Sequence, residues 1–354
     1  MGVPLTAVTS LIAANQITGI LGIFFGPLAD RLGYRLMMLA GLGIVVVGMF
    51  AAGLFPFYGV VLTALFVAGI GKIIFDPAIQ AYVGERVPFH RRGMVIGVLE
   101  MSWAGTTLVG IPFIALLIDQ FGWRAPFFAL SGFGLLGILG LIIFIPKDKK
   151  YTSTTLTSIG FKQAWQNLIK ERAAVGALGF SFFLSAANDN LFVVYGAWLE
   201  KDFNLSILAL GLGTSIIGVA ELLGEGMTAT LADKFGLKRS LVVGIFLTAI
   251  SYGVLPFLGQ TLPMALTGLF IIFLIFEYTI VTALSLCTEL LPGSRATMMA
   301  GFLAAGGLGR VFGAMIGGPV WLSGGILSTG LVSATISSLA LVSSIWGLLA
   351  LKKQ

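Results

Sequence analysis

The stretch Gly26-Pro-Leu-Ala-Asp30-Arg31-Leu-Gly33-Tyr-Arg35 decides the fold of this chain, because a second copy of it reads Leu231-Ala-Asp233-Lys-Phe-Gly236-Leu-Lys238-Arg239. The two Asp residues stand 203 positions apart, and each is followed by a base, an apolar residue and a glycine. Each copy interrupts a long apolar run. Because ionised side chains in hydrocarbon are costly, each copy predicts a tight turn between two membrane helices. Gly33 and Gly236 suit such turns, since glycine adopts positive φ without steric penalty.

The composition is that of an integral membrane protein. Of the 354 residues, 57% are hydrophobic and only 10% are charged, which is not the composition of a soluble globular domain. A single Cys and a single His argue against a His/Cys metal centre. No phosphate-binding or hydrolase motif occurs in the sequence. We therefore expect no enzymatic activity, no metal, no cofactor and no nucleic-acid partner.

Eleven apolar runs are long enough to span a bilayer, which takes about 20 helical residues. They lie near residues 5–28, 36–55, 57–82, 93–118, 124–145, 173–198, 206–231, 240–257, 263–288, 297–322 and 325–350. The one long gap, 146–172, ends in apolar residues at helical spacing between Phe161 and Ile169. This pattern predicts an amphipathic helix at the membrane interface. A soluble linker helix is the alternative.

The distribution of Lys and Arg predicts the orientation, because these residues are enriched in cytoplasmic loops. With both turn motifs in the cytoplasm, 17 of the 21 bases lie on that side. Arg124 and Lys201 lie outside, and Lys72 and Arg310 lie within apolar runs. We therefore expect a multi-pass protein of the plasma membrane with a cytoplasmic C-terminus.

The internal repeat extends beyond the turns, since residues 85–97 match residues 289–301 at an offset of 204. This predicts an N-terminal bundle (1–145), a cytoplasmic linker (146–172) and a C-terminal bundle (173–354). By the same offset, the partner of the helix that begins near residue 173 would precede Met1. We therefore expect eleven helices where the repeat calls for twelve, through a truncated reading frame or a mis-set start. A natural eleven-helix protein is the alternative.

The first turn closely resembles the signature loop between helices 2 and 3 of the major facilitator superfamily. The second is similar to its weaker repeat between helices 8 and 9, with Ala229 in the place of Gly26. Gly122-Trp123-Arg124 resembles the loop after helix 5 in efflux-type members, the drug:proton antiporter branch. The resemblance implies an all-α membrane fold of two pseudo-symmetric helical bundles.

The resemblance also implies a gate, in which charges at the cytoplasmic helix ends lock the two halves together when the carrier faces outward. An acid there also suits the positive N-terminus of a nearby helix. Solvated charges that only set topology are the alternative. The candidates are Gly26, Asp30, Arg31, Gly33, Arg35 and Glu85 in the first copy, and Asp233, Gly236, Lys238, Arg239 and Glu289 in the second.

Charged residues inside apolar runs form a second candidate site, since they are rare in membranes and mark function by default. The family's fold would place them around a central cavity, where an acid carries a proton and a cation binds an anion or neutralises an acid. Static ion pairing is the alternative, and it is favoured for Lys72 and Asp76, one helical turn apart. The candidates are Asp189, Glu221, Glu277 and Arg310, with the polar residues Asn15 and Gln16.

Small residues recur every four positions at Ala305, Gly309, Gly313 and Gly317, which predicts a face for close helix packing. For function, we expect a monomeric secondary transporter that moves a small molecule by alternating access, with protons as the coupling ion and efflux as the direction. An uptake symporter of the same fold is the first alternative. A non-transporting sensor or a degenerate fragment is the second.

Overall fold

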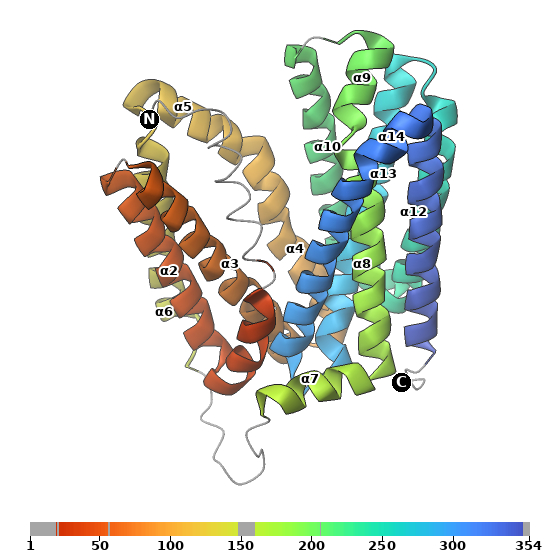
Figure 1. Cartoon of the computed structure of the whole chain (residues 1–354). Coiled ribbons are helices and arrows are strands. Elements are labelled where there is room, and N and C mark those ends of the chain that lie inside the picture. Colours follow the sequence, from red (N-terminus) through yellow and green to blue (C-terminus); the bar gives the residue numbers. More distant parts are fainter. Residues whose placement is uncertain (1–18, 20, 56, 148–159, 206, 350–354) are drawn as a thin grey trace. The chain divides into compact units, whose positions relative to one another are not determined.

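The computed structural model describes residues 19, 21–55, 57–147, 160–205 and 207–349, which are almost entirely helical and contain no strand (Figure 1). The all-α prediction is therefore confirmed, and every predicted span coincides with helix in this part of the chain. Eight of the described helical stretches are long and apolar enough to cross a membrane. Asn15 and Gln16 lie outside the described residues.

The chain groups into two compact units, each assembled from segments far apart in sequence. Unit 1 comprises Met1–Arg86, Gly110–Leu168 and Leu291–Ala304. Unit 2 comprises Val87–Val109, Ile169–Leu290 and Ala305–Gln354. Each unit thus contains a short segment that the sequence places in the opposite half of the repeat. The predicted boundaries at 145 and 173 remain a prediction.

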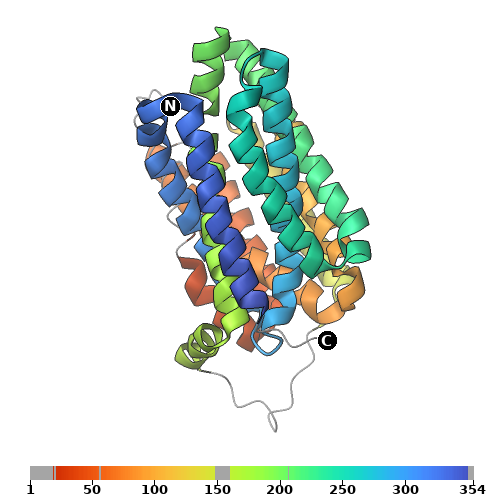
Figure 2. The ribbon, with the colours of Figure 1, turned by 90° about the vertical axis from the view of Figure 1, so that its right-hand side faces the viewer.

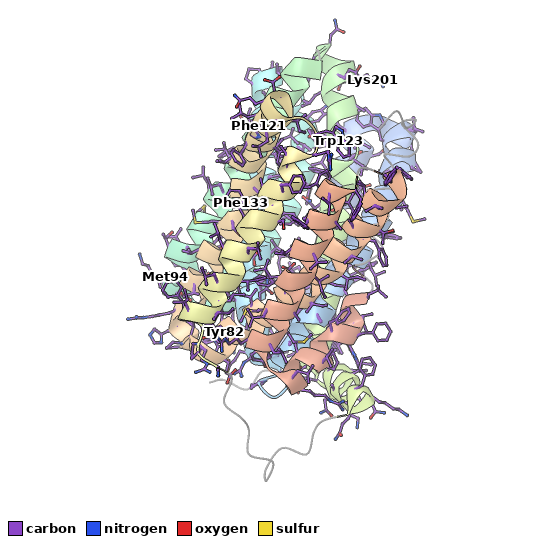
Figure 3. All side chains as sticks on the ribbon, turned by 90° about the vertical axis from the view of Figure 1, so that its left-hand side faces the viewer. Tyr82, Met94, Phe121, Trp123, Phe133 and Lys201 are labelled. Atoms are coloured by element: carbon purple, nitrogen blue, oxygen red, sulfur yellow. The ribbon has the colours of Figure 1, made fainter. Side chains whose placement is uncertain are left out.

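Unit 1 is built from helical residues 21–32, α2 (Tyr34–Leu54), α3 (Tyr58–Arg86), α5 (Ile111–Phe121), α6 (Ala125–Phe144), most of α7 (Phe161–Lys170) and the start of α14 (Arg295–Leu348). Helices α2 and α3 approach closely, because a Cβ on Gly41 would lie 2.6 Å from the carbonyl oxygen of Gly71. Figure 3 shows Phe121 and Trp123 at one end of this unit and Tyr82 at the other.

The linker helix predicted near Phe161–Ile169 is present as α7. Its Ala164 and Leu168 are buried, and the Phe161 ring stacks on Phe24 of unit 1 with the ring centroids 5.8 Å apart. The predicted apolar face of this helix is therefore used for packing.

Unit 2 contains η1 (Phe89–Arg91), α4 (Arg92–Gly105), α8 (Arg172–Phe192), α9 (Tyr195–Phe203), α10 (Ile207–Met227), η3 (Thr228–Ala232), α11 (Asp233–Phe235), α12 (Leu237–Leu258), α13 (Leu262–Leu290) and the rest of α14. A π-helical segment, η2 (Thr106–Gly110), continues α4 toward α5. Helices α12 and α13 run side by side (Figure 2), and their Tyr252, Leu255, Leu269 and Phe273 share one buried cluster.

The predicted small-residue face of α14 packs against α8 (Figure 1). A Cβ on Gly309 would lie 2.1 Å from the carbonyl oxygen of Phe182, and one on Gly313 would lie 2.3 Å from that of Ala186. No larger residue fits there without moving the helices, so the predicted packing role is confirmed. The two last predicted spans meet within α14 at Gly324 and Gly325, whose φ/ψ angles are not helical.

Candidate functional site

Both signature turns have the backbone that their glycines predicted. Gly33 separates helical residues 21–32 from α2 with φ of 98°, and Gly236 separates α11 from α12 with φ of 86°. A residue with a Cβ would be strained at either position. Each turn places its Asp, three residues earlier, beside the start of another helix.

Asp30 caps the N-terminus of α14. The backbone N–H groups of Ala296 and Thr297 each donate a hydrogen bond of 2.9 Å to its carboxylate, and the Thr297 hydroxyl donates a third of 2.6 Å. Tyr34 adds a fourth at 3.1 Å. Burial raises the pKa of Asp30, and the hydrogen bonds from Thr297 and Ala296 oppose that rise only in part. We call this contact, which lies within unit 1, the Asp30 cap.

Asp233 makes the corresponding contact within unit 2. Its two carboxylate oxygens accept hydrogen bonds from the backbone N–H groups of Gly93 (3.0 Å) and Met94 (2.9 Å), in the first turn of α4. We call this the Asp233 cap. In both caps a carboxylate satisfies N–H groups that a helix start leaves unpaired, and it faces the positive end of the helix dipole.

The two caps join opposite halves of the sequence. Asp30 and Ala296 are 266 residues apart, and Asp233 and Gly93 are 140 residues apart. The helix starts that they bind lie in the two segments that the 204-residue repeat relates. The repeated motif therefore builds the same interaction twice, once in each unit.

Two helices approach closely at each cap, although only the first signature motif has a glycine, Gly26, where the second has Ala229. A Cβ on Gly26 would lie 2.7 Å from the Cβ of Ala300. At the second cap the small residue stands on the other helix, where a Cβ on Gly97 would lie 2.6 Å from the nitrogen of Ala229. Ala229 is thus accommodated because Gly97 faces it.

The other charged residues of the two signature motifs are not among the hydrogen-bonding groups of the caps described above. Arg35 donates from its guanidinium to the carbonyl oxygen of Ile142 (2.9 Å), near the end of α6. Arg31, Glu85 and Arg239 are exposed, and Lys238 is partly exposed.

Glu289 forms an ion pair with Arg92, one of the 17 bases for which the charge distribution predicted only a cytoplasmic position. The Arg92 side chain is buried, and its Nε donates to the carbonyl oxygen of Val87 (3.0 Å). In the repeat, Arg91 aligns with a second base, Arg295. Arg92 aligns with Ala296 and therefore has no basic counterpart. Only the tertiary structure shows that Arg92 pairs with Glu289.

The charged residues predicted to line a cavity gather in unit 2. Glu221 on α10 and Asp189 on α8 each lie within electrostatic range of Arg310 on α14, as does Glu277 on α13. Arg310 is exposed and the three acids are partly buried. Within the described residues no carboxylate forms an ion pair with Arg310, so the alternative of static ion pairing is not seen for this group.

Asparagines on either side of Asp189 hold its segment of α8 in place. The Tyr252 hydroxyl donates to the side-chain oxygen of Asn188 (3.3 Å). The Asn190 amide donates to the carbonyl oxygen of Thr329 (3.2 Å) and to the Ser333 hydroxyl (3.0 Å). These bonds tie α8 to α12 and α14 and so orient Asp189.

Two further acids, which are not among the predicted cavity residues, belong to this group. Glu225 lies on α10 one turn after Glu221, and Glu100 lies on α4, and both are within electrostatic range of Glu277. Spacing along α10 could have linked Glu221 with Glu225, but the place of α4 is a tertiary feature. Over the described ranges, no set of three acidic, His or Cys side chains is arranged to hold a metal ion.

Lys72 and Asp76 on α3 form the ion pair that their spacing predicted. Both side chains are partly exposed, and both residues belong to unit 1. The structural interpretation of these two charges is therefore confirmed.

Comparison with known proteins gives one consistent family. The family model described as Major Facilitator Superfamily matches residues 1–188 and again residues 177–353. YceJ of Bacillus subtilis, an uncharacterized MFS-type transporter, is 25% identical over 299 residues, which cover 84% of this chain and 75% of YceJ.

A multi-drug resistance efflux pump PmrA homolog from Lactococcus lactis is 23% identical over 256 residues, covering 70% of this chain and 62% of that protein. Among solved structures, the transporter FucP in its outward conformation superposes with a TM-score of 0.82 at 14% identity, over 100% of this chain and 92% of FucP. At 14% identity this likeness is evidence for a shared fold and for nothing more.

Proposed function

Because this chain belongs to the major facilitator superfamily, we propose that it is a secondary transporter that exports a small molecule by alternating access, driven by protons. The observation that carries the proposal is the pair of Asp caps. Each is a small set of hydrogen bonds to one helix start, and such contacts break and re-form without unfolding a helix. The matched caps at Asp30 and Asp233 would serve as the gate, and the Arg92–Glu289 ion pair would reinforce the second of them.

The acids of unit 2 supply the second part of the proposal. Glu277, Glu221 and Asp189 lie in apolar helices around one exposed cation, Arg310. In such surroundings a carboxyl group that gains and loses a proton is less costly than a permanent charge. We assign proton coupling to this group, with Glu277 as its central member.

Efflux as the direction is supported by the likeness to the PmrA homolog. The base distribution supports a multi-pass protein of the plasma membrane whose C-terminus is cytoplasmic. We also propose that the transporter is a monomer.

The test uses everted membrane vesicles and a fluorescent cation such as ethidium, followed by a wider compound panel. We expect an imposed proton gradient to drive uptake into these vesicles. Glu277→Gln should abolish gradient-driven transport and retain substrate counterflow, because Gln mimics the protonated acid. Asp76→Asn, which removes an acid paired elsewhere, is the matched control and should keep driven transport. Undiminished driven transport by Glu277→Gln would contradict the coupling role.

A further inference from the structure

Glu225 is the most enclosed acid of unit 2. Its exposed fraction is 0%, and neither of its carboxylate oxygens has a hydrogen-bond partner among the described residues. The backbone of Ala104 approaches the carboxylate without reaching hydrogen-bonding geometry. A buried polar group without a partner is rare in folded proteins and calls for a physical explanation.

The charges that face Glu225 are all acidic. They are Glu100 on the neighbouring helix α4 and Glu221 one turn earlier on α10. Glu277 on α13 also lies within electrostatic range of Glu225. Arg310 on α14 acts on Glu221 and Glu277, but no described cation stands among the groups that act on Glu225.

An enclosed carboxylate surrounded by acids is far more costly as an anion than as a neutral acid. We therefore expect Glu225 to hold a proton in this arrangement. If the proton left, two negative charges would face each other across the contact between α4 and α10, where little water could screen them.

The Asp233 cap lies next to this contact between α4 and α10. Gly97 of α4 lies against the backbone of Ala229, one turn after Glu225. The first turn of α4 is held by Asp233 through Gly93 and Met94. Glu100 lies on the same helix, one turn beyond Gly97. Asp233 lies in α11, which follows α10 through η3, so a force that separates Glu100 from Glu225 acts between α4 and the helical segment that the Asp233 cap joins to it.

We propose that Glu225 is a proton-binding residue whose deprotonation separates α4 from α10 and releases the Asp233 cap. The inference rests on the proposed proton-coupled function and adds to it the site where a proton would act on the gate. Glu225 takes the proton itself, while Glu100 supplies the opposing charge.

The test measures the separation of α4 and α10 without any substrate. Spin labels at Val98→Cys and Leu223→Cys use exposed positions, 58% and 48% exposed, on a Cys287→Ser background that removes the one native cysteine. The full chain is placed in nanodiscs, and double electron–electron resonance gives the label distance from about pH 5 to about pH 9, the range in which buried carboxyl groups titrate. We expect the distance to lengthen as the pH rises.

Glu225→Gln should hold the short distance at every pH, and so should Glu225→Met if Gln perturbs folding. Glu100→Gln should reduce the lengthening, because the opposing charge is lost. Glu200→Gln, at an exposed position of α9, is the matched control and should behave like the parent. A parent that shows no lengthening, or a Glu225→Gln variant that still shows it, overturns the proposal. Because no transport is measured, failure of proton-driven export would be seen separately in the vesicle assay.

Discussion

Gly97 on α4 lies against Ala229 in η3, the segment that follows α10, so closely that a Cβ on Gly97 would come within 2.6 Å of the Ala229 nitrogen. At the matching contact the order is reversed, because Gly26 is the small residue and faces Ala300. In both places a missing Cβ lets a signature turn reach the helix start that its Asp caps. The glycine can stand on either of the two contacting helices, because the combined size of the two facing side chains limits how closely the backbones approach.

This relationship predicts the effect of adding one methyl group. Gly97→Ala forces the two backbones apart, and overpacking of this kind costs about 1–3 kcal/mol. We expect a lower thermal stability in detergent and slower transport in proteoliposomes. Gly105→Ala is the matched control on the same helix, since its Cβ meets nothing within 4 Å. Equal behaviour of the two variants would argue against the close contact.

The Asp30 cap predicts a graded effect of removing its hydrogen bonds. Asp30→Asn removes the charge that strengthens the bonds from Ala296 and Thr297, and we expect transport to fall about tenfold, which corresponds to about 1.4 kcal/mol. Expression and membrane insertion should be unchanged, because acids contribute little to topology. Thr297→Val removes only the hydroxyl bond and should have a smaller effect. Full-rate transport by Asp30→Asn in vesicles would remove its gating role.

The Arg92–Glu289 pair, in which the Arg92 side chain is buried and that of Glu289 is partly exposed, predicts a loss of stability that a second substitution reverses. Arg92→Met removes the buried guanidinium and its ion pair with Glu289, at a cost of about 2 kcal/mol, between the values for exposed and for buried pairs. The double variant Arg92→Met/Glu289→Met should recover most of this, because no unpaired charge remains. Lys72→Met breaks a more exposed pair and should cost less than about 1 kcal/mol. Thermal unfolding in detergent measures all three, and a double variant no more stable than Arg92→Met would contradict the pairing.

The orientation is tested by cysteine labels on a Cys287→Ser background. Phe121→Cys and Asn204→Cys, both at exposed positions, should react with an impermeant maleimide from outside the cell. His90→Cys and Gly293→Cys, also exposed, should react only after the membrane is opened. The reverse pattern would contradict the orientation and, with it, the cytoplasmic position of both caps.

Much of the fold could be predicted locally. A helix that crosses hydrocarbon must satisfy its own backbone and present an apolar surface, so long apolar runs predicted the positions of the helices. The charged turns interrupt those runs, and their glycines predicted the positive φ of Gly33 and Gly236. The close packing of Gly309 and Gly313 also followed from a four-residue spacing, although that spacing did not identify α8 as the partner helix.

The sequence by itself therefore determined the helices, the turns between them and the repeat that marks this family. It could not determine which side of each helix faces the interior, because lipid and protein core are both apolar and leave a weak periodic signal. The tertiary structure alone decided that Asp30 meets Thr297, that Arg92 pairs with Glu289, and that Glu225 comes within electrostatic range of Glu100. These contacts join residues more than one hundred positions apart, and they depend on the rotation and register of packed helices, which no local pattern encodes.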